Sequence, residues 1–426
     1  MKDASRATED QPATWDTSYE FRVVVLMAVA FGLVGLDRYI LFPLFPVIAE
    51  DLGLDYQDLG LISGALALAW GLACIFSGNL SDRIGAKRVI IVSIIAFSAL
   101  VAFTGLATGL ISLLVLRALM GFAEGGFMPA SIVQTIQASK PSRVGLNFGI
   151  QQMAAPLVGL GFGPLIAVGL LAVLPGWEWV FGVIAIPGFI VAFLVARTLR
   201  SPAEGPVNAS MGDEPGGPQV SLFDPLKYRN VFLGALALIC VFVTMNTLST
   251  FGPNYLTDYI GLSLGQMGAV MSSLGGGGLV GMIALPAISD RVGRKPVMLG
   301  ALLALVAALA VLLSATPLTT PLQLALIFFV VSSTSSGTIA TLVGPVISGS
   351  VPVAIAATAT GIVVGLGEIF GGAAGPAFAG YIAETYGIEL MPTIMISGAT
   401  LALLIVLIGI REPEKRDAPS GVSAHA

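Results

Sequence analysis

The chain has 426 residues, of which 56% are hydrophobic and only 11% are charged, and its formal net charge is −5. Soluble domains carry about 25% charged residues, so this composition excludes an ordinary soluble protein and indicates a bundle of membrane-spanning helices. The single histidine, His425, and the absence of a Walker-type phosphate loop argue against a metal centre, a histidine-based enzyme and an ATP-driven pump. We therefore expect no enzymatic activity, no cofactor and no bound metal.

Apolar windows of about 20 residues, the length that crosses a bilayer, recur along the whole chain and predict an all-α membrane protein with twelve transmembrane helices. The first six are expected at 22–47, 57–77, 89–108, 110–136, 147–172 and 178–197. The second six are expected at 230–252, 265–287, 297–314, 321–343, 356–382 and 390–410. The border between the tenth and eleventh spans rests only on the glycine and proline of the segment 348–352.

Proline, glycine and scattered acids between Arg200 and Pro225 indicate a solvated linker in the middle of the chain. This linker predicts two pseudo-symmetric six-helix bundles. The expected divisions are a cytoplasmic N-terminal tail (1–21), a first bundle (22–197), a cytoplasmic linker (198–228), a second bundle (229–411) and a cytoplasmic C-terminal tail (412–426).

The basic residues are distributed unevenly among the predicted loops. The odd-numbered loops contain acids and no Lys or Arg, whereas the even-numbered loops, the linker and the two ends carry 18 of the 20 basic residues. By the positive-inside rule, this pattern predicts a multi-pass protein of the cell (inner or plasma) membrane with both termini cytoplasmic. The two basic residues left over, Arg38 and Arg117, lie inside predicted spans and are therefore functional candidates.

A short motif occurs once in each half of the chain. The segment Leu80-Ser-Asp-Arg-Ile-Gly-Ala-Lys-Arg88 is echoed, 208 residues later, by Ile288-Ser-Asp-Arg-Val-Gly-Arg-Lys-Pro296. Each copy lies between the second and third span of its half, which predicts homologous halves with a substrate site between them. The basic residues could merely set the topology, but the repeated Asp and Gly favour a conformational gate. The gate residues would be Gly78, Asp82, Arg83, Gly85, Arg88, Asp290, Arg291 and Gly293.

With the twelve spans and the second motif copy, the segment Gly78–Arg88 resembles the loop signature of the major facilitator superfamily, over residues 20–412. A narrower resemblance is to the anion:cation symporter branch, whose first and fourth spans carry charged motifs. The matching residues are Asp37, Arg38, Pro46 and 51–54 around the first span, and Arg117, Gly121, Glu124, Gly125 and Pro129 in the fourth. The resemblance implies alternating access and uptake of an organic acid together with protons.

Two pairs of charged residues lie where a charge costs at least about 2.5–3.5 kcal/mol on membrane-insertion scales. Arg117 and Glu124 share one helix face. They could form a buried structural pair, or Arg117 could hold a substrate carboxylate while Glu124 exchanges a proton. Arg38 could snorkel to the interface with Asp37 neutralising it, or Arg38 could bind the anion in a central cavity while Asp37 carries a proton. We favour the functional interpretation of both pairs.

Glu368 departs from the symporter pattern, which predicts no carboxylate at this place in the eleventh span. It could be a hydrogen-bonded packing residue among the glycines of 365–372, a polar contact to substrate, or an additional proton-coupling site. Tyr39, Gln152 and Asn246 are further candidates for substrate binding, although residues of these types often only bond across helices or sit in the interfacial aromatic belt.

The leading prediction is a secondary active transporter for proton-coupled uptake of a small organic anion, such as a sugar acid, an aromatic acid or another carboxylate. A glycine- and proline-rich run at 159–167 resembles part of the signature of drug:proton antiporters. We favour the interpretation that this run kinks its helix and allows close packing between the halves, which importers and exporters both need. Proton-coupled export of an amphiphilic compound is the alternative function. A membrane sensor without transport is disfavoured, because neither tail is long enough for an output domain. We expect a functional monomer in the lipid bilayer, with the anion and protons as partners and no nucleic acid.

Overall fold

The computed structural model describes residues 15–200 and 224–412, with all side chains in those ranges except those of residues 75–84, 353, 354 and 357. Most of both predicted tails and most of the predicted linker therefore lie outside the described residues. Within the described ranges, all regular structure is helical. Twelve of these helices, several of them interrupted, are long and apolar enough to cross a membrane. The predicted all-α fold with twelve spans is confirmed.

The first six spans lie close to their predicted positions. They are α1 (Thr17–Tyr39) with α2 (Leu41–Leu52), α3 (Tyr56–Ile84), α4 (Ala86–Thr104), α5 (Leu110–Ala138), α6 (Val144–Pro156) with η1 (Leu157–Phe162) and α7 (Gly163–Leu171), and α8 (Trp177–Thr198). The first span breaks at Ile40 because Pro43 has no N–H to donate to the preceding turn. In the fifth span a π-helical turn, η1, follows Pro156.

The second six spans also match the predicted windows. They follow a short η4 (Asp224–Lys227) and are α9 (Arg229–Asn254) with η5 (Tyr255–Tyr259), α10 (Leu264–Val292), α11 (Arg294–Leu313), α12 (Pro321–Thr341) with η6 (Leu342–Ile347), α13 (Val353–Leu366) with η7 (Gly367–Ala373) and α14 (Ala374–Tyr386), and η8 (Ile388–Leu390) with α15 (Met391–Ile408). The predicted turn between the tenth and eleventh spans is present, because η6 ends at Ile347 and α13 begins at Val353.

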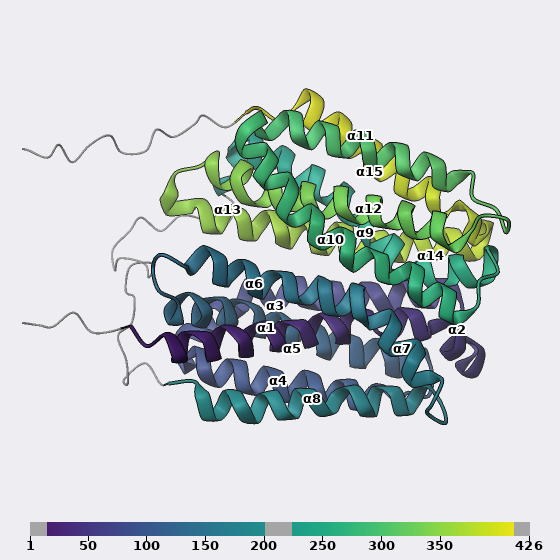
Figure 1. Ribbon diagram of the computed structural model, residues 1–426, viewed down its shortest axis with the longest axis horizontal. Coiled ribbons are helices and arrows are strands. Elements are labelled where there is room, and N and C mark those ends of the chain that lie inside the picture. Colours follow the sequence, from purple (N-terminus) through teal and green to yellow (C-terminus); the bar gives the residue numbers. More distant parts are fainter. Residues whose placement is uncertain (1–14, 201–223, 413–426) are drawn as a thin grey trace, which may run out of the picture.

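Helices α1–α8 gather on one side of the molecule and α9–α15 on the other; we call them the first and second groups (Figure 1). The groups meet where α3 packs against η7 and α14, and where α10 packs against η1 and α7. Both contacts are close because they use glycine. A Cβ atom on Gly60 would collide with the backbone oxygen of Pro376, and a Cβ atom on Gly275 would collide with the backbone of Gly161. Helix backbones therefore touch directly between the groups.

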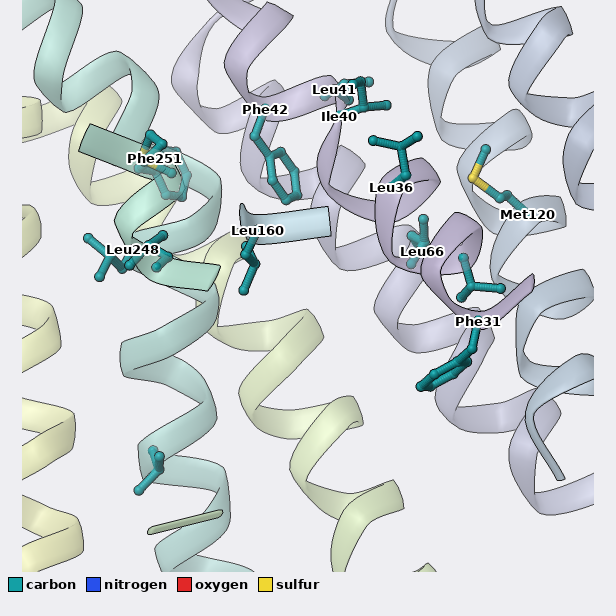
Figure 2. Packing of buried hydrophobic residues seen from close by; sticks show 14 of the residues in the cluster. Phe31, Leu36, Ile40, Leu41, Phe42, Leu66, Met120, Leu160, Leu248 and Phe251 are labelled. Atoms are coloured by element: carbon teal, nitrogen blue, oxygen red, sulfur yellow. The ribbon is translucent and has the colours of Figure 1, made fainter. Parts of the chain in front are cut away.

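Apolar side chains pack between the groups as well as within them. Figure 2 shows Phe42 of α2 and Leu160 of η1 between α1 and α9, the helix that carries Leu248 and Phe251. All four side chains are buried and belong to one continuous hydrophobic cluster. The two groups thus share a packed core in this conformation.

The start of the first span is fixed to its own group by Glu20. Its buried carboxylate accepts hydrogen bonds from Trp15 Nε1, from Asn147 Nδ2 and from the backbone nitrogen of Lys140. It also pairs with Arg143 at 2.8 Å. Because α1 begins at Thr17, Glu20 belongs to this helix, although the segment 1–21 was expected to be a tail.

Candidate functional site

Four of the five residues predicted to bind substrate line one small cavity between the two groups. Arg38 and Tyr39 come from α1, Arg117 from α5 and Asn246 from α9. The wall is completed by Phe42, Ile62, Ser63 and Leu66. The cavity has a volume of only about 10 Å³. That room suffices for about one water molecule, so the site is contracted in this conformation.

Arg38 joins the two groups through an ion pair. Its Nη2 lies 2.7 Å from Oε2 of Glu368 in η7, and the two side chains are only 13% and 10% exposed. The guanidinium also lies over the rings of Tyr39 and Trp70, 5.8 Å and 5.5 Å from their centroids, which adds cation–π attraction. Arg38 therefore faces the cavity and does not snorkel to the membrane surface. Glu368 is an ion-paired residue and not only a packing residue among glycines.

Arg117 is more deeply buried, with 2% of its surface exposed. Its Nη1 donates a hydrogen bond to the backbone oxygen of Asp37 at 2.9 Å and lies 3.4 Å from the sulfur of Met120. The buried Nε and Nη2 atoms make no hydrogen bond to any described residue. A buried donor without a partner costs about 1–3 kcal/mol. These two nitrogen donors are therefore well suited to an anion that enters the cavity.

Glu124 and Asp37 are buried near these arginines. Neither oxygen of Glu124 has a hydrogen-bond partner among the described residues, so it is not in a direct structural pair with Arg117. Glu124 is attracted electrostatically by Arg38 and Arg117, and Asp37 is repelled by Glu124 and attracted by Arg117. The four side chains form one electrostatically coupled group, in which a change of charge on one is felt by the others.

The remaining polar candidates are less well placed. Asn246 lines the cavity, but its Nδ2 donates to the backbone oxygen of Phe242 at 3.0 Å. Gln152 is not among the residues that line the cavity. Ser63, which the sequence analysis missed, shares a hydrogen bond of 3.0 Å with Thr250 of the second group. A serine in an apolar span carries no signal that distinguishes such a contact.

Tyr56, also missed, connects the groups at the end of the molecule remote from the start of α1. Its hydroxyl donates to Oδ2 of Asp258 in η5 at 2.8 Å, and its backbone nitrogen donates to Oε2 of Glu384 at 3.2 Å. The hydrogen bonds that join the groups in the described part of the chain therefore lie at this remote end, at the Ser63–Thr250 contact and at Arg38–Glu368.

The repeated motif has a glycine in the left-handed region in each copy. The φ angle is 89° at Gly85 and 114° at Gly293, which explains why the turn requires glycine. In the second copy Asp290 pairs with Arg294 of the adjoining helix, at 2.5 Å. Of the gate candidates whose side chains the structure describes, Arg88, Asp290 and Arg291 are exposed. The side chains at the predicted gate positions Gly78, Asp82 and Arg83 lie outside the described residues, so the gate remains a prediction.

Each motif copy forms hydrogen bonds with a residue just beyond the last span of its own group. In the first copy, Lys87 Nζ donates to the backbone oxygen of Leu199. In the second, the backbone nitrogens of Arg294 and Lys295 donate to the carboxylate of Glu412, at 2.6 Å and 2.8 Å. This carboxylate caps the start of α11 and satisfies two of its unpaired N–H groups.

Comparison with known proteins identifies the family. A model described as Major Facilitator Superfamily matches residues 27–369. The chain belongs to the major facilitator superfamily. The matched range includes both motif copies and the four coupled charges around Arg117. As a member of this superfamily, the protein is a multi-pass membrane transporter and not an enzyme.

Sequence relatives of this superfamily member transport different compounds. A hexuronate transporter of Bacillus subtilis is 28% identical over 283 residues, which cover 66% of this chain and 67% of the relative. It supports the predicted resemblance to the anion:cation symporter branch. A quinolone resistance transporter of Acinetobacter baumannii is 24% identical over 411 residues, which cover 90% of this chain and 93% of the relative.

A solved structure supports the fold of this superfamily member. It is a bacterial homolog to the human lysosomal transporter Spinster, in an inward-facing and unoccupied conformation. It aligns with a TM-score of 0.70 at 18% identity and covers 91% of this chain and 94% of its own. Likeness at this identity concerns the arrangement of helices alone.

Proposed function

We propose that this transporter takes up a small organic anion together with protons across the inner membrane. The observation that carries the proposal is that Arg38 and Arg117, the two basic residues within predicted spans, line the same cavity. Arginine keeps its charge at physiological pH and holds a carboxylate bidentately. Two arginines in one buried cavity therefore favour an anionic ligand. The similarity to a hexuronate transporter supports a carboxylate.

Glu124 and Asp37 are the proposed proton carriers, with Glu368 as an additional candidate. An anion placed beside these acids brings like charges together where the dielectric constant is low. A proton on one of the acids removes part of that repulsion, so proton and anion bind more favourably together than separately. Arg117 then donates its unpaired Nε and Nη2 hydrogens to the substrate.

The proposed orientation has both termini in the cytoplasm, because the basic loops lie on the side of the termini. In that orientation Tyr56, Asp258 and Glu384 lie at the external end, and this conformation is closed toward the outside. Transport then requires the two groups to rock about the cavity, so that it opens to one side at a time. One chain contains both groups and is expected to function as a monomer.

The second candidate function is proton-coupled export of an amphiphilic compound. The similarity to a quinolone resistance transporter along most of the chain favours it. An exporter of an uncharged amphiphile need not hold a carboxylate, so its transport would survive Arg117→Ala. Anion uptake, in contrast, would fall to background in that variant.

The test uses purified protein in liposomes that contain a pH-sensitive dye. A hexuronate, and then other organic acids, are added outside to the wild type, to Glu124→Gln and to the control Glu178→Gln, whose side chain is exposed at the remote end. Protein-free liposomes correct for acids that cross the lipid unaided. We expect lumen acidification with the wild type and the control, and background signal with Glu124→Gln, because an amide cannot carry the proton.

Two outcomes would contradict the proposal. Alkalinisation of the lumen would indicate antiport and support the export function. A wild type that transports an amphiphile but responds to none of the acids would remove the anion from the mechanism, while the fold and family would stand.

A further inference from the structure

We infer that Glu368 is a resident carboxylate that occupies Arg38 in the empty transporter, and that a substrate carboxylate must displace it. The inference rests on the proposed function, because it takes the substrate to be a carboxylate that binds Arg38. It assigns to Glu368 a role as an internal competitor of the substrate, one that determines apparent affinity and holds the unloaded transporter closed.

In the ion pair, the Glu368 carboxylate contacts Arg38 in the way that a substrate carboxylate could. Arg38 and Glu368 are 330 residues apart in the chain and belong to different groups, yet a single Nη2–Oε2 contact of 2.7 Å joins them. A guanidinium has five N–H donors and can bind a carboxylate through two parallel hydrogen bonds. The single contact leaves donors unused, so a free carboxylate that binds bidentately can compete with Glu368.

The cavity cannot admit a substrate while this pair is formed. Its volume of about 10 Å³, enough for about one water molecule, is far below the 300–1,000 Å³ of typical small-molecule sites. Because Arg38 contributes to the cavity wall and Glu368 belongs to the second group, their contact ties the two sides of the site together. Entry of a substrate therefore requires Glu368 to leave Arg38 and the groups to separate locally.

Glu368 lies in a segment that can accommodate such a movement. The π-helical turn η7 contains Gly367, Gly371 and Gly372, and π turns are sites where helices bend or adapt at functional positions. The Glu368 carboxylate lies against Gly372: a Cβ atom there would be 2.7 Å from Oε2. Glycine at this position thus leaves room for the carboxylate, and a methyl group would push it aside.

The ion pair also favours the step in which the transporter, without substrate, returns to its starting conformation. When no substrate is bound, a buried Arg38 without an anion is costly, and Glu368 removes that cost. When a substrate carboxylate is bound, it takes the place of Glu368 on Arg38. Glu368→Gln should therefore slow the return of the empty transporter and leave the movement of the loaded one largely intact.

The test compares two transport modes of Glu368→Gln in proteoliposomes, with a radiolabelled hexuronate as the probe. In net uptake, where the empty transporter must return, the rate should fall at least about tenfold, as expected when a buried charge loses its partner. In exchange, where the probe is present on both sides, the rate should stay near that of the wild type. The apparent KM should fall several-fold, because the competitor is gone. The control Glu389→Gln, exposed in the same group, should match the wild type.

Two further measurements separate a local effect from misfolding and from failure of the proposed function. Gly372→Ala retains Glu368 but displaces its carboxylate, so it should lower net uptake and leave exchange near the wild type, as expected for Glu368→Gln. Spin labels at Leu106 and Leu318, exposed at the remote end of the two groups, report separation of the groups without any substrate. Glu368→Gln should lengthen this distance in the empty protein, and Glu389→Gln should not.

The inference would be overturned if Glu368→Gln showed wild-type net uptake, KM and label distance. A higher KM with net uptake and exchange reduced equally would also overturn it, since Glu368 would then contact the substrate instead of competing with it. If the labels separate but the wild type takes up no organic acid, the ion pair holds the groups together and the proposed function fails.

Discussion

The two arginines of the cavity are held in different ways. Arg38 is paired with Glu368 and lies over two aromatic rings. Arg117 has one hydrogen bond to a backbone oxygen, and its Nε and Nη2 are unpaired among the described residues. Arg117 is therefore ready to bind an anion in the empty protein, whereas Arg38 becomes available when Glu368 moves. An incoming carboxylate is expected to meet Arg117 first.

A conservative replacement tests this role of Arg117. Arg117→Lys keeps the charge but removes the planar pair of donors, and an ammonium does not reproduce bidentate binding. We expect uptake of a hexuronate to fall by about tenfold, the equivalent of roughly 1.4 kcal/mol. The measurement is the initial uptake rate in proteoliposomes, with Arg197→Lys, exposed at the end of α8, as the control. Wild-type uptake by Arg117→Lys would mean that positive charge alone suffices.

At this scale the sequence revealed the charges but not their partners. Subtracting the loop residues isolated Arg38 and Arg117, and the apolar surroundings made Glu368 conspicuous. That Arg38 contacts Glu368, and that Arg117 contacts the backbone of Asp37 instead of Glu124, depends on how distant helices pack. Glu20 was missed as a buried residue because, at the edge of an apolar window, it reads as a tail acid.

Among the helices, the contact of η1 with α10 shows how closely the two groups approach. Gly275 lies against the backbone of Gly161, so any side chain at position 275 must push the groups apart. The neighbouring Gly276 differs, since a Cβ atom there would meet only the ring of Phe329, at 3.7 Å. Position 276 can therefore accept a methyl group, whereas the adjacent position 275 cannot.

These two glycines provide a matched pair of variants. Gly275→Ala is expected to lower the stability of this conformation by about 1–3 kcal/mol, the usual cost of overpacking. Gly276→Ala should be close to neutral because its new methyl group makes an ordinary contact. Thermal unfolding of both purified variants in the same detergent measures the difference. Equal unfolding temperatures would show that the groups do not stay in contact at this point in solution.

Helix positions followed from the sequence more readily than helix interruptions. Apolar length located the twelve spans, because a spanning helix must satisfy its backbone internally, and the glycine and proline of 348–352 located the turn between the tenth and eleventh spans. The π turns η1, η5, η6 and η7 were not predicted. They lie at or close to prolines or glycines, but most prolines and glycines in this chain do not produce them, because the neighbouring helices decide which turns widen.

At the scale of the molecule, the polar contacts between the two groups in the described part of the chain lie at the remote end, at Ser63–Thr250 and at Arg38–Glu368. Tyr56 alone supplies two of them, one from its hydroxyl and one from its backbone nitrogen. A transporter that opens at this end must break both, and each hydrogen bond contributes roughly 0.5–1.5 kcal/mol. Such modest contacts are compatible with frequent opening.

Removing one of these contacts should shift the balance between closed and open states. Tyr56→Phe loses the hydrogen bond to Asp258 but keeps the one from its backbone nitrogen to Glu384. A loss of about 1 kcal/mol changes a two-state ratio about fivefold, toward the state open at the remote end. The distance between spin labels at Leu106 and Leu318 measures this change.

Tyr386→Phe is the control, because Tyr386 is exposed at the same end of the second group. An unchanged distance distribution in Tyr56→Phe would show that the hydroxyl does not hold the groups together. A change of equal size in Tyr386→Phe would point to a general effect of losing a tyrosine hydroxyl at this surface.

The attachment of Glu412 to the start of α11, and of Leu199 to Lys87, has a consequence for anything joined to this protein. Leu199 precedes the linker and Glu412 precedes the C-terminal tail, and both residues lie against the loops that carry the repeated motif. A fluorescent reporter or affinity tag attached immediately after Glu412 would therefore pull on the α10–α11 loop. A tag placed beyond the tail, with the natural residues kept as a spacer, would spare it, so expression designs that trim this tail risk a folded protein with altered transport.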